Sequence, residues 1–71
     1  MNVRDVRAFL TRFGDDDWVE VIGSTGRIIV RGNGMEVALI DESPASVEWR
    51  KPGMIVSVSL QHWLDDTREG R

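Results

Sequence analysis

The 71-residue sequence predicts an α+β fold, with an N-terminal helix packed on an antiparallel meander of about five strands and a short C-terminal helix. Three observations predict it. Apolar residues first recur at helical spacing, then alternate with polar residues in five short segments, and turn-forming residues separate those segments. Strands so close in sequence pair most simply as antiparallel neighbours. We expect one domain over 1–71, with 65–71 as a frayed polar tail.

The first element is a helix over residues 3–13. Its apolar residues fall at helical spacing and cover one face: Val3, Val6, Phe9, Leu10 and Phe13. Asn2 is a typical N-cap, and Asp5 lies in the first turn, where the helix dipole favours a carboxylate. Gly14 follows this segment, and glycine is the residue type most often found just beyond the C-terminus of a helix.

Five strands follow, predicted over 18–22, 27–31, 35–40, 47–50 and 55–60. The segment 23–26 predicts a turn, and Gly32-Asn33-Gly34 is typical of a hairpin turn. Pro52-Gly53 predicts a type II turn. The spacing of Leu60, Trp63 and Leu64 then favours a short closing helix.

Composition limits the function classes. The chain has no cysteine and one histidine, which excludes a disulfide framework and a cysteine–histidine zinc site. The net charge of −3 argues against general nucleic-acid binding. The sequence shows neither an apolar signal segment nor a membrane-length apolar run, so we expect a cytoplasmic protein. Because so short a chain buries a small core, we also expect a homo-oligomer.

Three motifs contain residue types that can carry chemistry. Asp15-Asp16-Asp17 lacks the alternating spacing of a calcium loop and predicts a solvated turn. His62 has no nucleophile motif to serve as a base. The glycine turns are followed by strands, whereas phosphate-binding loops are followed by helices. The sequence therefore predicts no catalytic residue, no metal site, no cofactor and no enzyme activity.

Two groups of residues remain as binding candidates. Basic residues at the predicted strand ends, with one tryptophan among them, could stack against and neutralise a small anionic ligand: Arg27, Arg31, Trp49, Arg50 and Lys51. The polar helix face and the C-terminal tryptophan are candidates for contact with a partner protein: Arg4, Arg7 and Trp63. Core packing is the alternative for Trp18, Trp49 and Trp63, and strand-end charge is the alternative for the basic residues.

The N-terminal third, Val3 to Phe13 followed by Asp15 to Val21, resembles the opening of small phage and prophage accessory proteins. In those proteins a short helix leads through an acidic turn into an apolar strand. This chain departs from that pattern at Val6, where leucine is usual, and at Gly14, where proline often follows the helix. The resemblance implies a protein that acts by binding inside a bacterial host. Such proteins inhibit host enzymes, or form oligomers that sequester nucleotide signals.

The leading hypothesis is a small non-catalytic protein that binds and modulates a host or phage protein. The first alternative is an oligomer that sequesters a nucleotide or another small anionic signal. The second is a module that binds single-stranded nucleic acid on the meander face, which suits the arginines and Trp49 but not the negative net charge. No functional residue is carried over from the resemblance, since the shared positions are scaffold positions.

Overall fold

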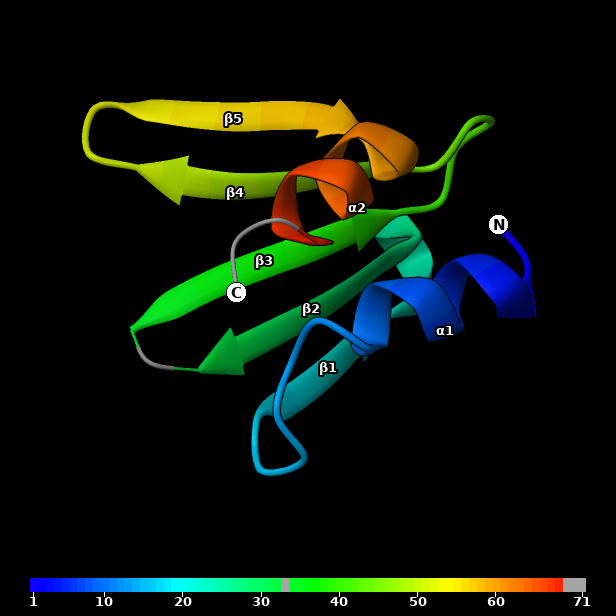
Figure 1. The fold of residues 1–71 in the computed structure, drawn as a ribbon, viewed down its shortest axis with the longest axis horizontal. Helices are drawn as coiled ribbons and strands as arrows, with labels where there is room; N and C mark the ends of the chain where they lie inside the picture. Colours follow the sequence, from blue (N-terminus) through cyan, green and yellow to red (C-terminus); the bar gives the residue numbers. More distant parts are fainter. Residues whose placement is uncertain (33, 69–71) are drawn as a thin grey trace.

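The computed structural model describes residues 1–32 and 34–68, and in this range two helices cover one side of a five-stranded antiparallel sheet (Figure 1). The sheet order β1-β2-β3-β4-β5 follows the chain, which confirms the predicted α+β meander. In chain order the elements are α1 (Val3–Leu10), β1 (Trp18–Ile22), the 3-10 turn η1 (Gly23–Thr25), β2 (Arg27–Gly32), β3 (Met35–Ile40), β4 (Ser46–Lys51), β5 (Met54–Ser59) and α2 (Leu60–Arg68).

Helix α1 begins at the predicted cap but ends early. The Asn2 side chain accepts a hydrogen bond from the Asp5 amide, and the Asp5 carboxylate accepts one from the Asn2 amide. The helix ends at Leu10, because the amides of Arg12 and Phe13 bond to carbonyls three residues back. These tighter bonds turn the chain away from the α-helical path that the periodicity predicts up to Phe13.

The turns place glycine where the backbone requires it. Gly26 and Gly53 adopt φ values of 66° and 80°, in the left-handed region that costs glycine least. The value at Gly53 fits the second central position of the predicted type II turn. Asn33, at the centre of the predicted Gly32–Gly34 hairpin turn, lies outside the described residues.

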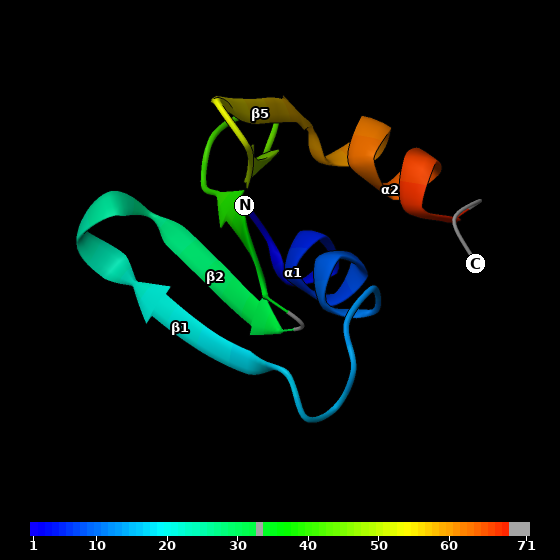
Figure 2. The ribbon, with the colours of Figure 1, turned by 90° about the vertical axis from the view of Figure 1, so that its left-hand side faces the viewer.

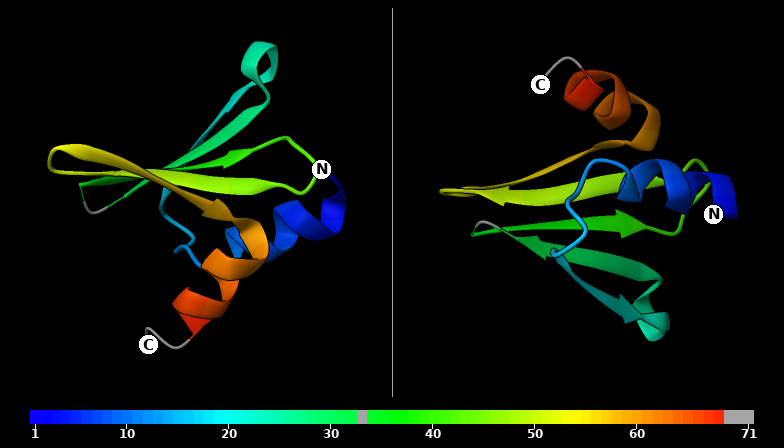
Figure 3. Two further views of the ribbon diagram at one scale, coloured as in Figure 1. Left: turned by 90° about the horizontal axis from the view of Figure 1, so that it is seen from above. Right: turned by 60° about the horizontal axis from the view of Figure 1, so that its bottom comes forward.

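The register divides the strand residues between two faces of the sheet. We call the side beneath the helices the helix face; it includes Val30, Val37 and Val47. The other side, which no helix covers in Figures 2 and 3, is the open face. The open face carries, strand by strand, Trp18, Glu20 and Ile22; Arg27, Ile29 and Arg31; Glu36, Ala38 and Ile40; Ser46, Glu48 and Arg50; and Ile55, Ser57 and Ser59.

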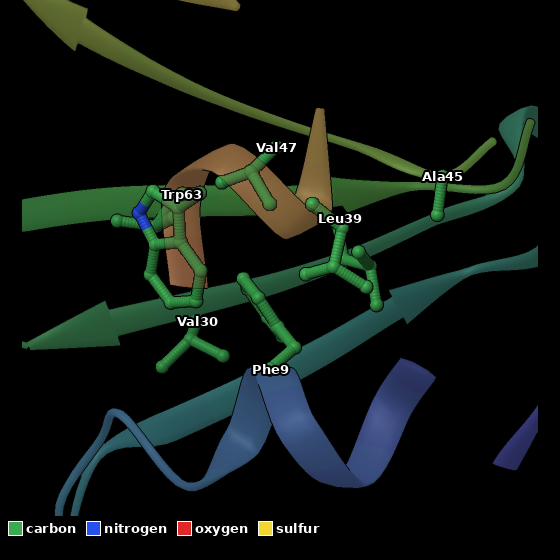
Figure 4. Close-up of a cluster of buried hydrophobic side chains, with 8 residues drawn as sticks. Phe9, Val30, Leu39, Ala45, Val47 and Trp63 are labelled. Carbon is green, nitrogen blue, oxygen red and sulfur yellow. The ribbon is translucent and has the colours of Figure 1, made fainter. Parts of the chain in front are cut away.

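The core lies between the helices and the middle strands. Phe9 from α1 is fully buried and its ring centroid lies 5.1 Å from that of Trp63 on α2 (Figure 4). Val30, Leu39 and Val47 from three successive strands close the same cluster. The other buried members are Val37, Ala45 and Leu60. The Phe9 side chain of α1 thus packs against both α2 and the middle strands of the sheet.

Two apolar residues of α1 depart from the predicted buried face. Val3 is 69% exposed and Leu10 is 37% exposed, although both share the helical spacing of Phe9. A single short helix on a twisted sheet can press only part of a wide apolar stripe against it.

Helix α2 continues to Arg68, into the segment 65–71 expected to fray; residues 69–71 lie outside the described residues. Its last turn is anchored by Thr67, whose hydroxyl donates to the Trp63 carbonyl at 2.8 Å and accepts from Arg12 Nε at 2.9 Å. Arg12 Nη2 also donates to the Leu64 carbonyl. Within residues 1–32 and 34–68, neither helix is long and apolar enough to cross a membrane.

Candidate functional site

A cleft of about 790 Å³ opens where the α1–β1 loop, α2 and the β2–β3 end of the sheet meet. We call it the aromatic cleft. Its apolar lining comes from Phe13, Val30, Met35, Val37, Trp49 and Trp63, and its polar lining from Thr11, Arg12, Gly14, Asp17, Gly32, Asp66 and Thr67. Trp63 is 7% exposed and forms its floor, whereas Trp49 is half-buried and Met35 is 58% exposed. The cleft therefore offers aromatic and thioether surface to a ligand.

The acidic loop supports one wall of this cleft. Asp17 Oδ2 accepts a hydrogen bond from the Gly14 amide at 2.9 Å, which closes the loop on itself. The same carboxylate lies against Gly32 so closely that a Cβ there would come within 2.2 Å of Asp17 Oδ1. Glycine at position 32 thus lets the loop dock on the end of β2.

The charges at the rim are mainly negative. Asp17 from the α1–β1 loop and Asp66 from α2 both line the cleft, and Asp15 and Asp16 belong to the same loop as Asp17. Among the described residues that line the cleft, Arg12 is the one cation, and it already donates to Thr67 and Leu64. The cleft therefore favours a neutral or cationic ligand over an anionic one.

Two of the candidate anion-binding arginines lie in ion pairs on the open face. Arg31 donates to Glu20 at 2.5 Å and to Glu36 at 2.7 Å, and these hydrogen bonds, Glu20 first, raise the pKa of Arg31. Arg27 on β2 reaches across β3 to Glu48 on β4 at 2.9 Å. Carboxylates thus already occupy the charge-bearing groups of both arginines.

The other three candidates lie elsewhere. Arg50 shares the open face with the arginines, but at the end of β4 away from Arg27. Trp49 and Lys51 alternate with it and lie on the helix face, so the sheet itself separates Trp49 from Arg27 and Arg31. The structure does not bring the five predicted ligand residues into one pocket.

The predicted partner-binding residues are also divided. Arg4 and Arg7 are exposed on α1, and Arg7 borders a shallow apolar groove along that helix with Val3, Val6 and Leu10. Trp63 lies in the core, where its ring stacks on Phe13 at a centroid distance of 5.9 Å. It contributes to binding only as the floor of the aromatic cleft.

Sequence reasoning missed Asp17, Asp66 and Met35 as lining residues of the cleft. A partial signal was present for Asp66, since Trp63, Asp66 and Thr67 have the i, i+3, i+4 spacing of one helix face. No local pattern brings Met35 or Asp17 there, because the contacts that do so join segments distant in sequence.

His62 and Asp66 are open to solvent. His62 Nε2 lies 3.3 Å from Asp66, both exposed by more than half, and the His62 amide donates to Ser59 Oγ. In the part of the chain that the structure describes, no group of three or more histidine and acidic side chains is placed to hold a metal ion. Comparisons of the chain with protein-family models, characterised proteins and solved structures found no match.

Proposed function

We propose that the protein is a small non-catalytic binding protein, and that it holds a segment of a partner protein in the aromatic cleft. The observation that supports this most directly is the half-buried Trp49 beside the exposed Met35 in a concave, largely apolar site. Proteins most often bind ligands in concave, mostly apolar sites in which a few polar groups fix the orientation of the ligand. Tryptophan and methionine are the residue types enriched at protein interfaces.

The partner segment carries a large apolar side chain next to a basic one. The apolar side chain packs against Trp49 and Met35, and the basic one lies near Asp17 or Asp66 at the rim. A cation over the face of an indole ring gains further electrostatic attraction. The negative net charge of the chain also favours approach of a basic segment.

Charge on the open face argues against the two alternative hypotheses. That face carries three arginines and three glutamates, so its formal charges cancel: Arg27, Arg31 and Arg50 against Glu20, Glu36 and Glu48. A single strand of nucleic acid needs a net positive track along its backbone. A small anion would have to displace the carboxylates that now bind Arg27 and Arg31.

The test is selection from a random peptide library displayed on cells, with the full chain as bait. We expect the recovered peptides to share an aromatic or large aliphatic residue within two positions of lysine or arginine. Trp49→Leu keeps apolar bulk but removes the indole face, and it should lose about tenfold or more in affinity for them. Trp18→Leu is the matched control, because Trp18 lies outside the cleft and is 71% exposed.

Three outcomes would overturn this assignment. One is recovered peptides with no basic residue, and another is equal binding by the Trp49→Leu variant, with circular dichroism showing both variants folded. The third is a thermal shift with a panel of nucleotides that Arg27→Gln abolishes, which would establish the sequestering alternative instead.

A further inference from the structure

Strand β1 is an edge of the sheet with apolar side chains on both of its faces. Trp18 on the open face is 71% exposed, and on the helix face Val19 and Val21 are 45% and 69% exposed. Neither helix covers this strand, which Figure 3 shows standing away from α1 and α2. An edge strand exposes unpaired backbone groups, and soluble proteins usually protect such edges with charge, proline or a covering element.

The opposite edge, β5, is protected in that way. Helix α2 follows it directly and packs against it. Its exposed apolar residues, Met54 and Ile55, lie at one end, while Ser57 and Ser59 alternate along the rest of its open face. Of the two edges, β1 is the one with exposed apolar side chains on both sides of its central residue.

The sequence of β1 is complementary to itself when a second copy runs antiparallel. With a two-fold axis at Glu20, Trp18 faces Ile22 of the other copy and Val19 faces its Val21. Directly opposed residues share a face of the sheet, so each apolar side chain meets another. Four of the five cross-strand pairs along the strand are then apolar with apolar.

The fifth pair sets two Glu20 side chains against each other. Each already accepts a hydrogen bond from Arg31 of its own chain at 2.5 Å. In the register of β1 with β2, Arg31 lies opposite Trp18, so the arginine that neutralises Glu20 lies on β2, the strand next to this edge in the same chain. The ion pair therefore reduces the like-charge repulsion that would otherwise oppose this register.

We infer that β1 pairs antiparallel with β1 of a second copy of this chain, about a two-fold axis at Glu20, to form a ten-stranded sheet across a homodimer. The aromatic cleft lies outside the five residues that pair, so the inference does not depend on the proposed function. A contact built on one short strand is small, and we expect a micromolar dissociation constant.

Single-cysteine variants test the register directly, because the chain has no cysteine of its own. In this register the two copies of residue 20 lie opposite each other at about 5 Å between Cα atoms, within disulfide range. Under mild oxidation, Glu20→Cys should dimerise covalently about tenfold faster or more than Ser24→Cys, an exposed control in η1.

The flanking positions make the test specific. In the inferred register, residue 19 of one copy and residue 19 of the other are offset by two residues, about 7 Å along the strands. Val19→Cys should therefore form the disulfide-linked dimer no faster than the control. A mixture of Val19→Cys and Val21→Cys should link rapidly. Rapid linking of Val19→Cys alone, or the absence of any rate difference from Ser24→Cys, would overturn the inferred register.

Sedimentation equilibrium measures the association itself. Val21→Lys should shift the protein to monomer, whereas Val3→Lys should not, since Val3 is equally exposed at 69% but lies on α1. Glu20→Gln should tighten the dimer by removing the like charges. A monomer at millimolar concentration, or equal effects of the two lysine variants, would exclude a dimer through β1.

Discussion

Replacing Gly32 by alanine should displace the acidic loop that forms one wall of the aromatic cleft. The new Cβ would lie 2.2 Å from Asp17 Oδ1 and 2.7 Å from its Cγ, closer than any real contact of a Cβ. The Asp17 carboxylate must then move, and it loses its hydrogen bond with the Gly14 amide. A hydrogen bond to a charged acceptor stabilises by about 1.5 kcal/mol, and alanine in a strand regains about 0.5 kcal/mol relative to glycine. The net loss of about 1 kcal/mol should lower the unfolding temperature of the variant by about 4–8 °C.

A double-mutant cycle with Asp17→Ala assigns the cause, using urea denaturation followed by tryptophan fluorescence. Without the carboxylate, alanine at position 32 has room and should stabilise by about 0.5 kcal/mol, because alanine suits a strand better than glycine. Gly14→Ala is the matched control, since its Cβ would approach the same carboxylate at an ordinary 3.7 Å. Equal destabilisation by Gly32→Ala in both backgrounds would refute the proposed clash.

Three further substitutions probe the contacts that hold α1 and α2 in place. Phe9→Ala removes the fully buried ring between the helices and should lower the free energy of unfolding, measured by urea denaturation, by about 3–5 kcal/mol. Phe9→Leu should lower it less. A loss below about 1 kcal/mol for Phe9→Ala would contradict the central place of this ring in the core. Asn2→Ala should cost about 1 kcal/mol by the same measurement, and Asn2→Asp should retain the cap, so equal losses would argue against capping. Arg12→Ala should speed amide hydrogen exchange in the last turn of α2, where Arg12 donates to Thr67 and Leu64, and should leave exchange in α1 unchanged. Unaltered exchange in the last turn of α2 would show that these hydrogen bonds contribute nothing to its stability.

The local features of the fold were predictable because their causes lie within a few residues of sequence. The Asn2 cap needs only Asp5 three positions later, and the Pro52-Gly53 turn needs only its own two residues. The ends of the two helices were less predictable. The local hydrogen bonds of the Arg12 and Phe13 amides end α1 at Leu10. The tertiary contact between Arg12 and Thr67 anchors the last turn of α2 in a segment whose polarity predicted fraying.

The candidate site was less predictable, because it depends on which segments meet. Trp18, Trp49 and Trp63 looked alike in the sequence, yet one is exposed at an edge, one lines the cleft and one lies in the core. The ion pair of Arg27 with Glu48 joins strands that are not neighbours in the sheet. No pattern along a single strand reveals a partner two strands away.

The sequence by itself determined the order of the elements, the turns between them and the two faces of each strand, since these follow from backbone geometry and from alternation. Only the tertiary structure decided which of those faces are covered. Val19 and Val30 face each other across β1 and β2, yet Val30 is 1% exposed and Val19 is 45% exposed. The physical reason is the short length of the two helices, which cover the middle of the sheet and leave β1 at its edge uncovered.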